Sequence, residues 1–198
     1  DTVDEINALA TIADNVMKLG NGGAVTYTDA DWVSALGSKF GLTGVTTSNI
    51  GEIKTAINAA DATHDGSAID AYAELQTIIS GVRINDYSNL TTGYETPSIT
   101  DYQAINSAAN SSYLGAYNDA VSYVHTTKDK AWMSSMITSY NTILAEANGT
   151  TADLTASDPL VTDYDHIGVT VRPVGGSTVA SLTLLNEAIA NLTADKVD

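Results

Sequence analysis

The fold class follows from residues 1–20, which read DTVDEINALATIADNVMKLG. Apolar side chains recur at every third or fourth position, at Ile6, Leu9, Ile12, Ala13 and Val16. This spacing places them on one face of an α-helix. Acidic residues stand in the first turn, where the helix dipole favours negative charge, and glycines follow Leu19, where a helix is expected to end. The stretch therefore predicts an amphipathic helix.

This helix has two further copies along the chain. Leu9-Ala10-Thr11-Ile12 matches Leu75-Gln76-Thr77-Ile78 and Tyr140-Asn141-Thr142-Ile143, at offsets of 66 and 65 residues. Two more landmarks follow in the same order each time. The first is Asp31-Trp32, Asp101-Tyr102 and Asp163-Tyr164; the second is a third-helix stripe that starts at Ile50, Leu114 and Leu182. The matches predict three repeats, 1–64, 65–128 and 129–198, with Leu9, Leu75 and Tyr140 at equivalent core positions.

Each repeat reads as three helices. The expected ranges are 3–19, 28–39 and a helix from about 48; then 67–83, 99–108 and 112–125; then 130–147, 160–167 and 178–193. A unit of about 65 residues buries only about 60% of its unfolded surface, so stacking on a neighbour would stabilise it. We therefore expect an all-α fold of three tandem three-helix bundles, arranged in series with helical junctions.

The junctions decide whether the bundles form a rod. No Gly or Pro interrupts residues 116–145, which predicts one long helix, or two nearly collinear helices, over about 112–146. Alternatively, Asp129 is an N-cap that starts a fresh helix. A sharp reversal between His125 and Ala131 would count against a rod and favour a compact segment with a binding role. At the first junction, Gly66 predicts a break.

Charge and composition exclude several classes of function. The chain has 24 Asp and Glu against 8 Lys and Arg, a net charge of −16, and no cysteine. Binding to nucleic acid needs a clustered basic footprint, and anionic lipid head groups would repel this chain. No apolar run approaches the roughly 18 residues that span a bilayer. We expect no nucleic-acid partner, no membrane insertion, no disulfide and no thiol nucleophile.

Candidate catalytic and metal-binding residues are few. The histidines, His64, His125 and His166, are interpreted as residues near helix ends rather than as catalytic or zinc-binding groups. The pairs Asp29/Asp31 and Asp163/Asp165 lack the spacing of an EF-hand and are interpreted as helix caps, with low-affinity surface calcium left open. The segment 175–178 is interpreted as a glycine turn, because no lysine follows it. The sequence thus predicts no catalytic, cofactor-binding or metal-binding residues, and we expect no enzyme.

Two tyrosines are candidates for partner contacts. Tyr87 and Tyr94 fall in the polar stretch 85–96, which is expected to be a loop. Exposed tyrosines are good contact residues at protein interfaces. This loop could equally pack back over its own bundle.

Three segments together carry a family resemblance. They are Asp1-Thr2-Val3-Asp4-Glu5-Ile6-x-Ala8-Leu9, Thr162-Asp163-Tyr164-x-x-Ile167-Gly168-Val169-Thr170 and Gly41-Leu42-Thr43-Gly44-Val45-Thr46. The set resembles the tandem helical repeats of very large bacterial surface and adhesin-like proteins. The second repeat departs from the pattern, because it lacks the Gly-Val-Thr segment. The resemblance implies export to an extracellular or cell-surface location, a spacer or adhesive role, and no catalytic residues.

Two functional hypotheses follow. In the first, the chain is a stalk or spacer segment, and its partners are neighbouring repeats of the same parent chain. The last residues would continue into a copy of Asp1-Thr2-Val3-Asp4, which agrees with a segment of a longer array. In the second, it is a binding module of an adhesin that recognises a surface protein, glycan or peptide through its loops. A contiguous exposed apolar patch would favour binding, and scattered single residues would favour a spacer.

Overall fold

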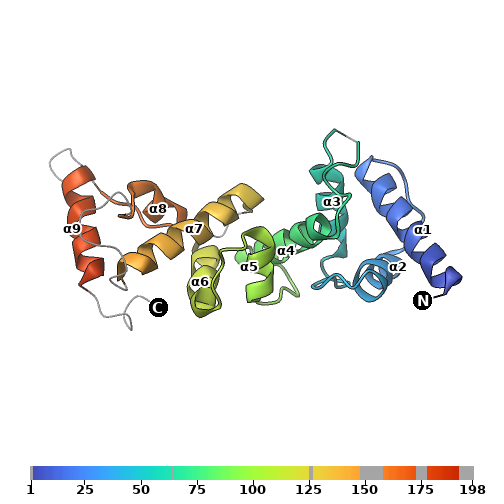
Figure 1. Ribbon diagram of the computed structural model, residues 1–198, viewed down its shortest axis with the longest axis horizontal. Coiled ribbons are helices and arrows are strands. Elements are labelled where there is room, and N and C mark those ends of the chain that lie inside the picture. Colours follow the sequence, from blue (N-terminus) through green and yellow to red (C-terminus); the bar gives the residue numbers. More distant parts are fainter. Residues whose placement is uncertain (1, 64, 125–126, 148–157, 173–177, 192–198) are drawn as a thin grey trace. The chain divides into compact units, whose positions relative to one another are not determined.

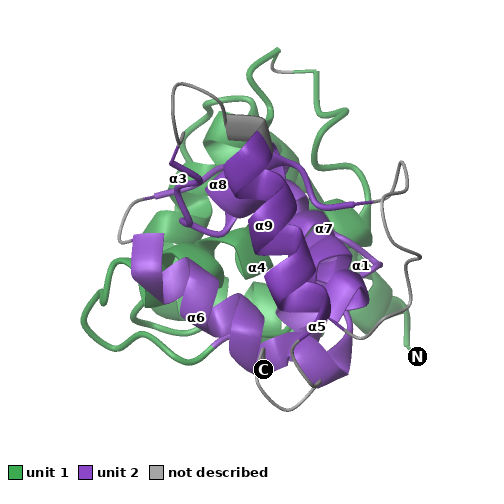
Figure 2. Ribbon diagram, turned by 90° about the vertical axis from the view of Figure 1, so that its left-hand side faces the viewer, with its two compact units in different colours: residues 1–96 green, residues 97–198 purple. Residues whose placement is uncertain are grey.

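The computed structural model describes residues 2–63, 65–124, 127–147, 158–172 and 178–191. Within these ranges the secondary structure consists of helices and turns, with no β-strand, so the described part of the protein is all-α. The helices group into two compact units, 1–96 and 97–198 (Figures 1 and 2). None of the described helices is long and apolar enough to cross a membrane.

Unit 1 contains α1 (Val3–Gly20), α2 (Asp29–Val33), the π-helix η1 (Ser34–Lys39), α3 (Ile50–Ala60) and α4 (Tyr72–Ser88). Side-chain caps fix where the first two helices begin. Thr2 caps α1 by accepting a hydrogen bond from the Glu5 backbone N–H, while the Glu5 carboxylate accepts one from the Thr2 N–H. Thr28 and Asp31 form the same reciprocal pair at α2. Such pairs satisfy backbone donors that a helix leaves open.

The core of unit 1 forms where α1, α2 and α4 pack against α3. Its fully buried side chains come from every helix of the unit: Ile12, Trp32, Leu36, Ile53, Ile57 and Ile79. The ring of Tyr27 packs edge-on against Trp32, with 5.3 Å between ring centroids. Helix α4 is the first helix of the predicted second repeat. It thus completes a core that is built mainly by helices of the predicted first repeat.

Unit 2 contains α5 (Ile99–Ile105), the 3₁₀ turn η2 (Ser111–Tyr113), α6 (Leu114–Val124), α7 (Lys130–Ala147), α8 (Val161–His166) and α9 (Thr178–Ala190). Helix α7 is central, because α5 and α6 pack on one part of it and α8 and α9 on another (Figure 1). Its buried face includes Met133, Met136, Ile137, Ile143 and Leu144. The predicted range of α7 is confirmed residue for residue.

The expected range of the first helix in the second repeat, 67–83, is wrong by about five residues at each end. Helix α4 begins at Tyr72 because the Glu74 carboxylate accepts a hydrogen bond from the Ala71 N–H at 3.0 Å. It continues to Ser88, where Ile84 and Ser88 are buried. Before it, the buried Asp61 carboxylate accepts a hydrogen bond from the N–H of Gly66, whose φ is +82°. The predicted break at Gly66 is confirmed.

The predicted continuous helix over 112–146 is also wrong. Helix α6 ends at Val124, α7 begins at Lys130, and residues 125 and 126 lie outside the described part. The Tyr117 hydroxyl donates to Asn141 Oδ1 at 2.6 Å, whereas one straight helix would place these residues about 36 Å apart. Helix α7 therefore folds back against α6, so no continuous helix of the kind that a rod would need joins them.

The alternative start of α7 is the one observed. The carboxylate of Asp129 accepts a hydrogen bond from the Trp132 N–H at 2.8 Å, as an N-cap does. We expect Asp129→Ala to lower the free energy of unfolding by about 1 kcal/mol. Asp129→Asn, which keeps a capping oxygen, should restore most of the loss in urea unfolding. Equal losses in both variants would contradict the cap.

The expectation that Leu9, Leu75 and Tyr140 share one core environment is wrong. Leu75 is buried, Tyr140 is half-buried, and Leu9 is 41% exposed. The division between the compact units, after Thr96, falls inside the predicted repeat 65–128. The division into repeats 1–64, 65–128 and 129–198 stays a prediction.

Candidate functional site

A buried hydrogen-bond chain occurs twice in unit 2. The Tyr102 hydroxyl donates to Asn118 Oδ1 at 2.7 Å, and Asn118 Nδ2 donates to the Pro97 carbonyl at 3.4 Å. The Tyr164 hydroxyl donates to Asn186 Oδ1 at 2.6 Å, and Asn186 Nδ2 donates to the Pro159 carbonyl at 3.0 Å. In both places a tyrosine of the second helix, an asparagine of the third and a proline before the second helix are joined.

The predicted first repeat, 1–64, departs from this chain at both side chains. Trp32 stands at the tyrosine position, and Lys54 stands at the asparagine position of the third-helix stripe. The Lys54 ammonium pairs instead with the Asp29 carboxylate at 2.5 Å. The second and third helices of the first repeat are thus joined by an ion pair rather than by a buried amide.

Burial keeps the Tyr164 hydroxyl protonated and able to donate. Desolvation raises the pKa of Tyr164, and the negative charges of Glu146 and Asp163 raise it further. We expect Asn118→Leu to lower the free energy of unfolding by about 1–3 kcal/mol, because the buried Tyr102 hydroxyl would lose its hydrogen bond to Asn118. Adding Tyr102→Phe to that variant should recover part of the loss in a double-mutant cycle. Additive losses would contradict the hydrogen bond.

Helices α4 and α7 each bind backbone groups that precede them in the chain. Gln76 Oε1 accepts a hydrogen bond from the Thr43 N–H at 2.9 Å, and Gln76 Nε2 donates to the Thr43 carbonyl at 3.1 Å. Asn141 stands 65 residues later at the matched position, and its Nδ2 donates to the Ala108 carbonyl at 2.9 Å. Thr43 and Ala108 both lie shortly before a third helix, α3 or α6. An amide clamp thus recurs at matched positions.

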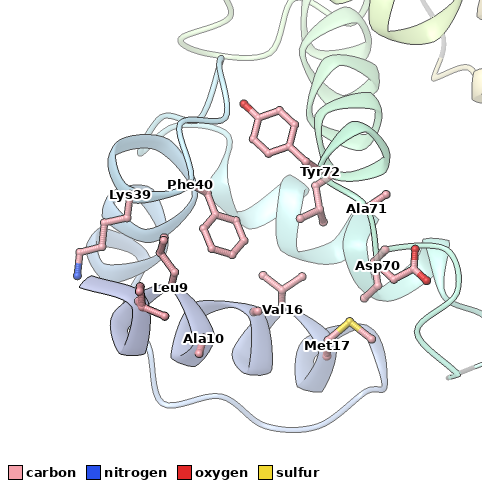
Figure 3. Close-up of a pocket in the computed structure, with 13 residues that line it drawn as sticks. Leu9, Ala10, Val16, Met17, Lys39, Phe40, Asp70, Ala71 and Tyr72 are labelled. Atoms are coloured by element: carbon pink, nitrogen blue, oxygen red, sulfur yellow. The ribbon is translucent and has the colours of Figure 1, made fainter. Parts of the chain in front are cut away.

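An apolar groove opens in unit 1 beside α1. Its volume is about 720 Å³, and its lining includes Ile6, Leu9, Phe40, Ile69, Tyr72 and Leu75. Figure 3 shows Val16 pointing from α1 toward the ring of Phe40, with Lys39 and Asp70 at opposite ends. The Tyr72 hydroxyl points away from α1 and donates to the Gly41 carbonyl at 2.8 Å. The groove is large enough for several side chains of a partner and carries few charges.

Tyr87 and Tyr94 form an edge-to-face pair, with 5.6 Å between ring centroids. Tyr87 lies in the last turn of α4 rather than in a loop, whereas Tyr94 lies beyond the helix and is 43% exposed. Near them, the Arg83 guanidinium pairs with Glu95 at 3.1 Å. The sequence left open whether this stretch packs on its own bundle or is exposed for a partner. Tyr87 packs on its own unit, whereas Tyr94 is exposed to solvent.

Asp86 lies next to this pair and makes unit 1 sensitive to pH. Burial raises the pKa of the Asp86 carboxyl, and the negative charge of Glu52 raises it further, while a hydrogen bond to Thr91 lowers it. Its contribution to stability is therefore fully present below the ordinary pKa of 3.8 and is lost as pH rises through the folded-state pKa. We expect Asp86→Asn to raise the free energy of unfolding at pH 7 and to flatten its pH dependence. A variant less stable than the parent at pH 7 would contradict this.

A serine, a histidine and an aspartate meet between α7 and α8. Ser139 Oγ donates to Asp163 Oδ1 at 2.8 Å and lies 3.0 Å from His166 Nδ1. A nucleophilic triad needs the histidine between the serine and the carboxylate. Here the serine lies between the other two and is buried, so this cluster pins α8 to α7. His64, His125 and residues 175–177 lie outside the described part.

The acidic pairs take part in local bonds. Asp31 and Asp163 accept hydrogen bonds from the backbone N–H groups of Thr28 and Leu160, as caps do. Among the described residues, no group of three His, Cys, Asp or Glu side chains is arranged to hold a metal ion. Comparison of the chain with protein-family models, with curated proteins and with solved structures finds no match.

Sequence reasoning missed the groove and the amide clamp. Ile6, Leu9 and Ala13 were assigned to a core stripe, and nothing in their spacing separates a buried face from an open one. Gln76 and Asn141 carried a usable signal, because both are amides at matched positions of the repeated tetrapeptide.

Proposed function

We propose that the chain is a structural stalk or spacer segment of a large extracellular bacterial surface or adhesin-like protein. In this proposal it is built of three tandem three-helix repeats, 1–64, 65–128 and 129–198. The observation that carries the proposal is the recurrence of the same bonds at matched positions: the buried Tyr-Asn-Pro chain in two copies and the amide clamp in two copies.

The amide clamp supports an array rather than separate domains. Helices α4 and α7 each hold backbone groups from the predicted preceding repeat, and Leu75 and Ile79 add apolar burial to the core of that repeat. The reversal between α6 and α7 changes how such an array would be joined. Successive repeats would pack through crossing helices and shared cores, instead of through one continuous helix.

Surface chemistry and the candidate sites agree with a structural role. The net charge of −16 would keep arrays apart in solution and soluble outside the cell. In the Ser139–His166–Asp163 cluster, the serine rather than the histidine bonds to the other two residues, so the histidine is not placed between the serine and the carboxylate. We propose no enzymatic activity.

Location on the cell surface is the decisive test of this proposal. Antibodies raised against the purified chain should label intact, unpermeabilised cells of the producing organism, and brief protease treatment of those cells should remove the label. A cytoplasmic protein should remain protected in the same cells as a control. Labelling that appears only after permeabilisation would contradict the proposal.

A binding module is the second candidate. The fold-back of α7 onto α6, the apolar groove beside α1 and the exposed ring of Tyr94 favour it. Tyr94 is held by Tyr87 and lies beside the Arg83–Glu95 ion pair, which offers both stacking and polar contacts to a glycan or peptide. Screening the chain on arrays of surface glycans and peptides tests this candidate. Tyr94→Ala should abolish any genuine signal, whereas Tyr123→Ala, which removes another exposed ring, should not.

A further inference from the structure

Four positions of α1 in the groove have matched positions in α4 and α7. Applying the offsets of 66 and 65 residues to Ile6, Leu9, Ala10 and Ala13 gives two further sets of four. The sets are Tyr72, Leu75, Gln76 and Ile79 in α4, and Ile137, Tyr140, Asn141 and Leu144 in α7.

In α4, this face is partly covered by α3 and by the loop between η1 and α3. Tyr72 donates to the Gly41 carbonyl, Gln76 clamps Thr43, and Leu75 and Ile79 are buried in the core around α3. Leu75 is only 4% exposed as a result.

In α7, the same face is covered by the corresponding helices of the predicted second repeat. The ring of Tyr140 packs edge-on against Tyr117 of α6, with 6.1 Å between centroids. Asn141 accepts a hydrogen bond from the Tyr117 hydroxyl and donates to the Ala108 carbonyl. Ile137 is completely buried.

In α1, no helix of the described chain covers this face in the same way. The face lines the open groove instead. Leu9 is 41% exposed, although its matches are buried at Leu75 and half-buried at Tyr140. Ile6 is 59% exposed, whereas its match in α7, Ile137, is completely buried and its match in α4, Tyr72, is 53% exposed. Ala10 replaces the clamping amide with a methyl group, so the face of α1 is entirely apolar at these four positions.

We propose that the groove beside α1 is a docking site for the third helix of another repeat of this kind. Helix α9 of a second copy of this chain would supply that helix. On α9, Leu185 matches Tyr117 and Ile53 in the third-helix stripe, and its neighbour Leu184 is one of the most exposed leucines of the chain. The interface joins two different surfaces, the groove beside α1 and helix α9, so each copy can bind one copy through its groove and another through its α9.

The first experiment is sedimentation velocity of the 198-residue chain over a wide range of concentration. The sedimentation coefficient should rise with concentration, and Leu9→Asp should abolish the rise. Leu90→Asp is the matched control, because Leu90 is an exposed leucine of the same unit outside the groove, at φ +53°, a conformation that aspartate tolerates. A single species at all concentrations, or association that survives Leu9→Asp, would overturn the proposal.

The second experiment uses the absence of cysteine from the chain. Asn141 and Tyr117 touch within unit 2, so their matched positions, Ala10 of one copy and Leu185 of another, should lie close in the assembly. Mixing differently tagged A10C and L185C chains with a short bis-maleimide should give a cross-linked heterodimer. The T11C chain is the control, because Thr11 lies on the exposed opposite face of α1 and should cross-link to L185C far more slowly. Equal rates for A10C and T11C would overturn the docking geometry.

This inference rests on the proposed repeat architecture, but its failure is separable. Cells could display the protein at their surface while the purified chain stays monomeric, which would refute only the docking site. Conversely, cross-linking of A10C to L185C in a protein found only inside cells would refute the surface role and leave the docking site in place.

Discussion

Replacing Trp32 with alanine is expected to lower the free energy of unfolding of the chain by about 3–5 kcal/mol. The indole is 2% exposed and packs in the core of unit 1, against the ring of Tyr27 and alongside Leu36 and Ile53. Removing it takes away a large apolar surface and leaves a cavity that the rigid helices around it fill only in part. Urea unfolding followed by circular dichroism measures the loss.

Trp132→Ala is the matched control, because it makes the same chemical change at a half-buried site. Trp132 lies in the first turn of α7 with the Lys128 ammonium 5.1 Å from its ring centroid. A cation–π contact of this kind contributes about 0.5–1 kcal/mol at an exposed site, so the loss should be several-fold smaller. Similar losses in the two variants would mean that Trp32 is not a core residue.

The second large effect is expected from Leu75→Ala, which should cost about 2–5 kcal/mol because Leu75 lies in the core around α3. The matched Leu9→Ala substitution should cost under about 1 kcal/mol in dilute solution, since Leu9 is largely open to solvent. Thermal and urea unfolding of both variants, at protein concentrations too low for association, measures the difference.

This pair of substitutions tests whether a leucine at the matched position contributes to stability only where the helices of a preceding predicted repeat cover it. Leu9 and Leu75 are the same residue at the same place in the repeated tetrapeptide, so intrinsic helix propensity is equal in the two. Equal costs would show that the groove face of α1 is covered within the chain itself. They would contradict the assignment of Leu9 to an open face.

Local signals allowed much of the fold to be predicted from the sequence. The apolar spacing predicts the range of α7 and the start of α1. In the structure, Asp129 and Thr2 cap these helices through bonds that act within one turn. Helix α4 was misplaced because its start depends on a bond from Ala71 to Glu74, and because burial of Ile84 carries it past the polar residues near its end.

The turn between α6 and α7 was harder to predict because two local rules conflict there. Absence of Gly and Pro favours a continuous helix, while Asp129 favours a new start, and the sequence gives no measure of which is stronger. The contact that decides it, between Tyr117 and Asn141, joins residues 24 positions apart. The groove was beyond prediction for a related reason, since the exposure of Leu9 depends on what lies against it rather than on its own neighbours in sequence.

The fold-back of α7 onto α6 has a mechanical consequence. Under tension, a straight helix resists until its own turns open, whereas two helices joined by a turn are held together by the side-chain contacts between them. Rupture of the contact between Tyr117 and Asn141 would release the 24-residue span, which extends to about 80 Å when pulled straight. A segment made of such helix pairs would lengthen in steps as the force rises and would refold when the force falls. It would therefore be an extensible spacer rather than a rigid one.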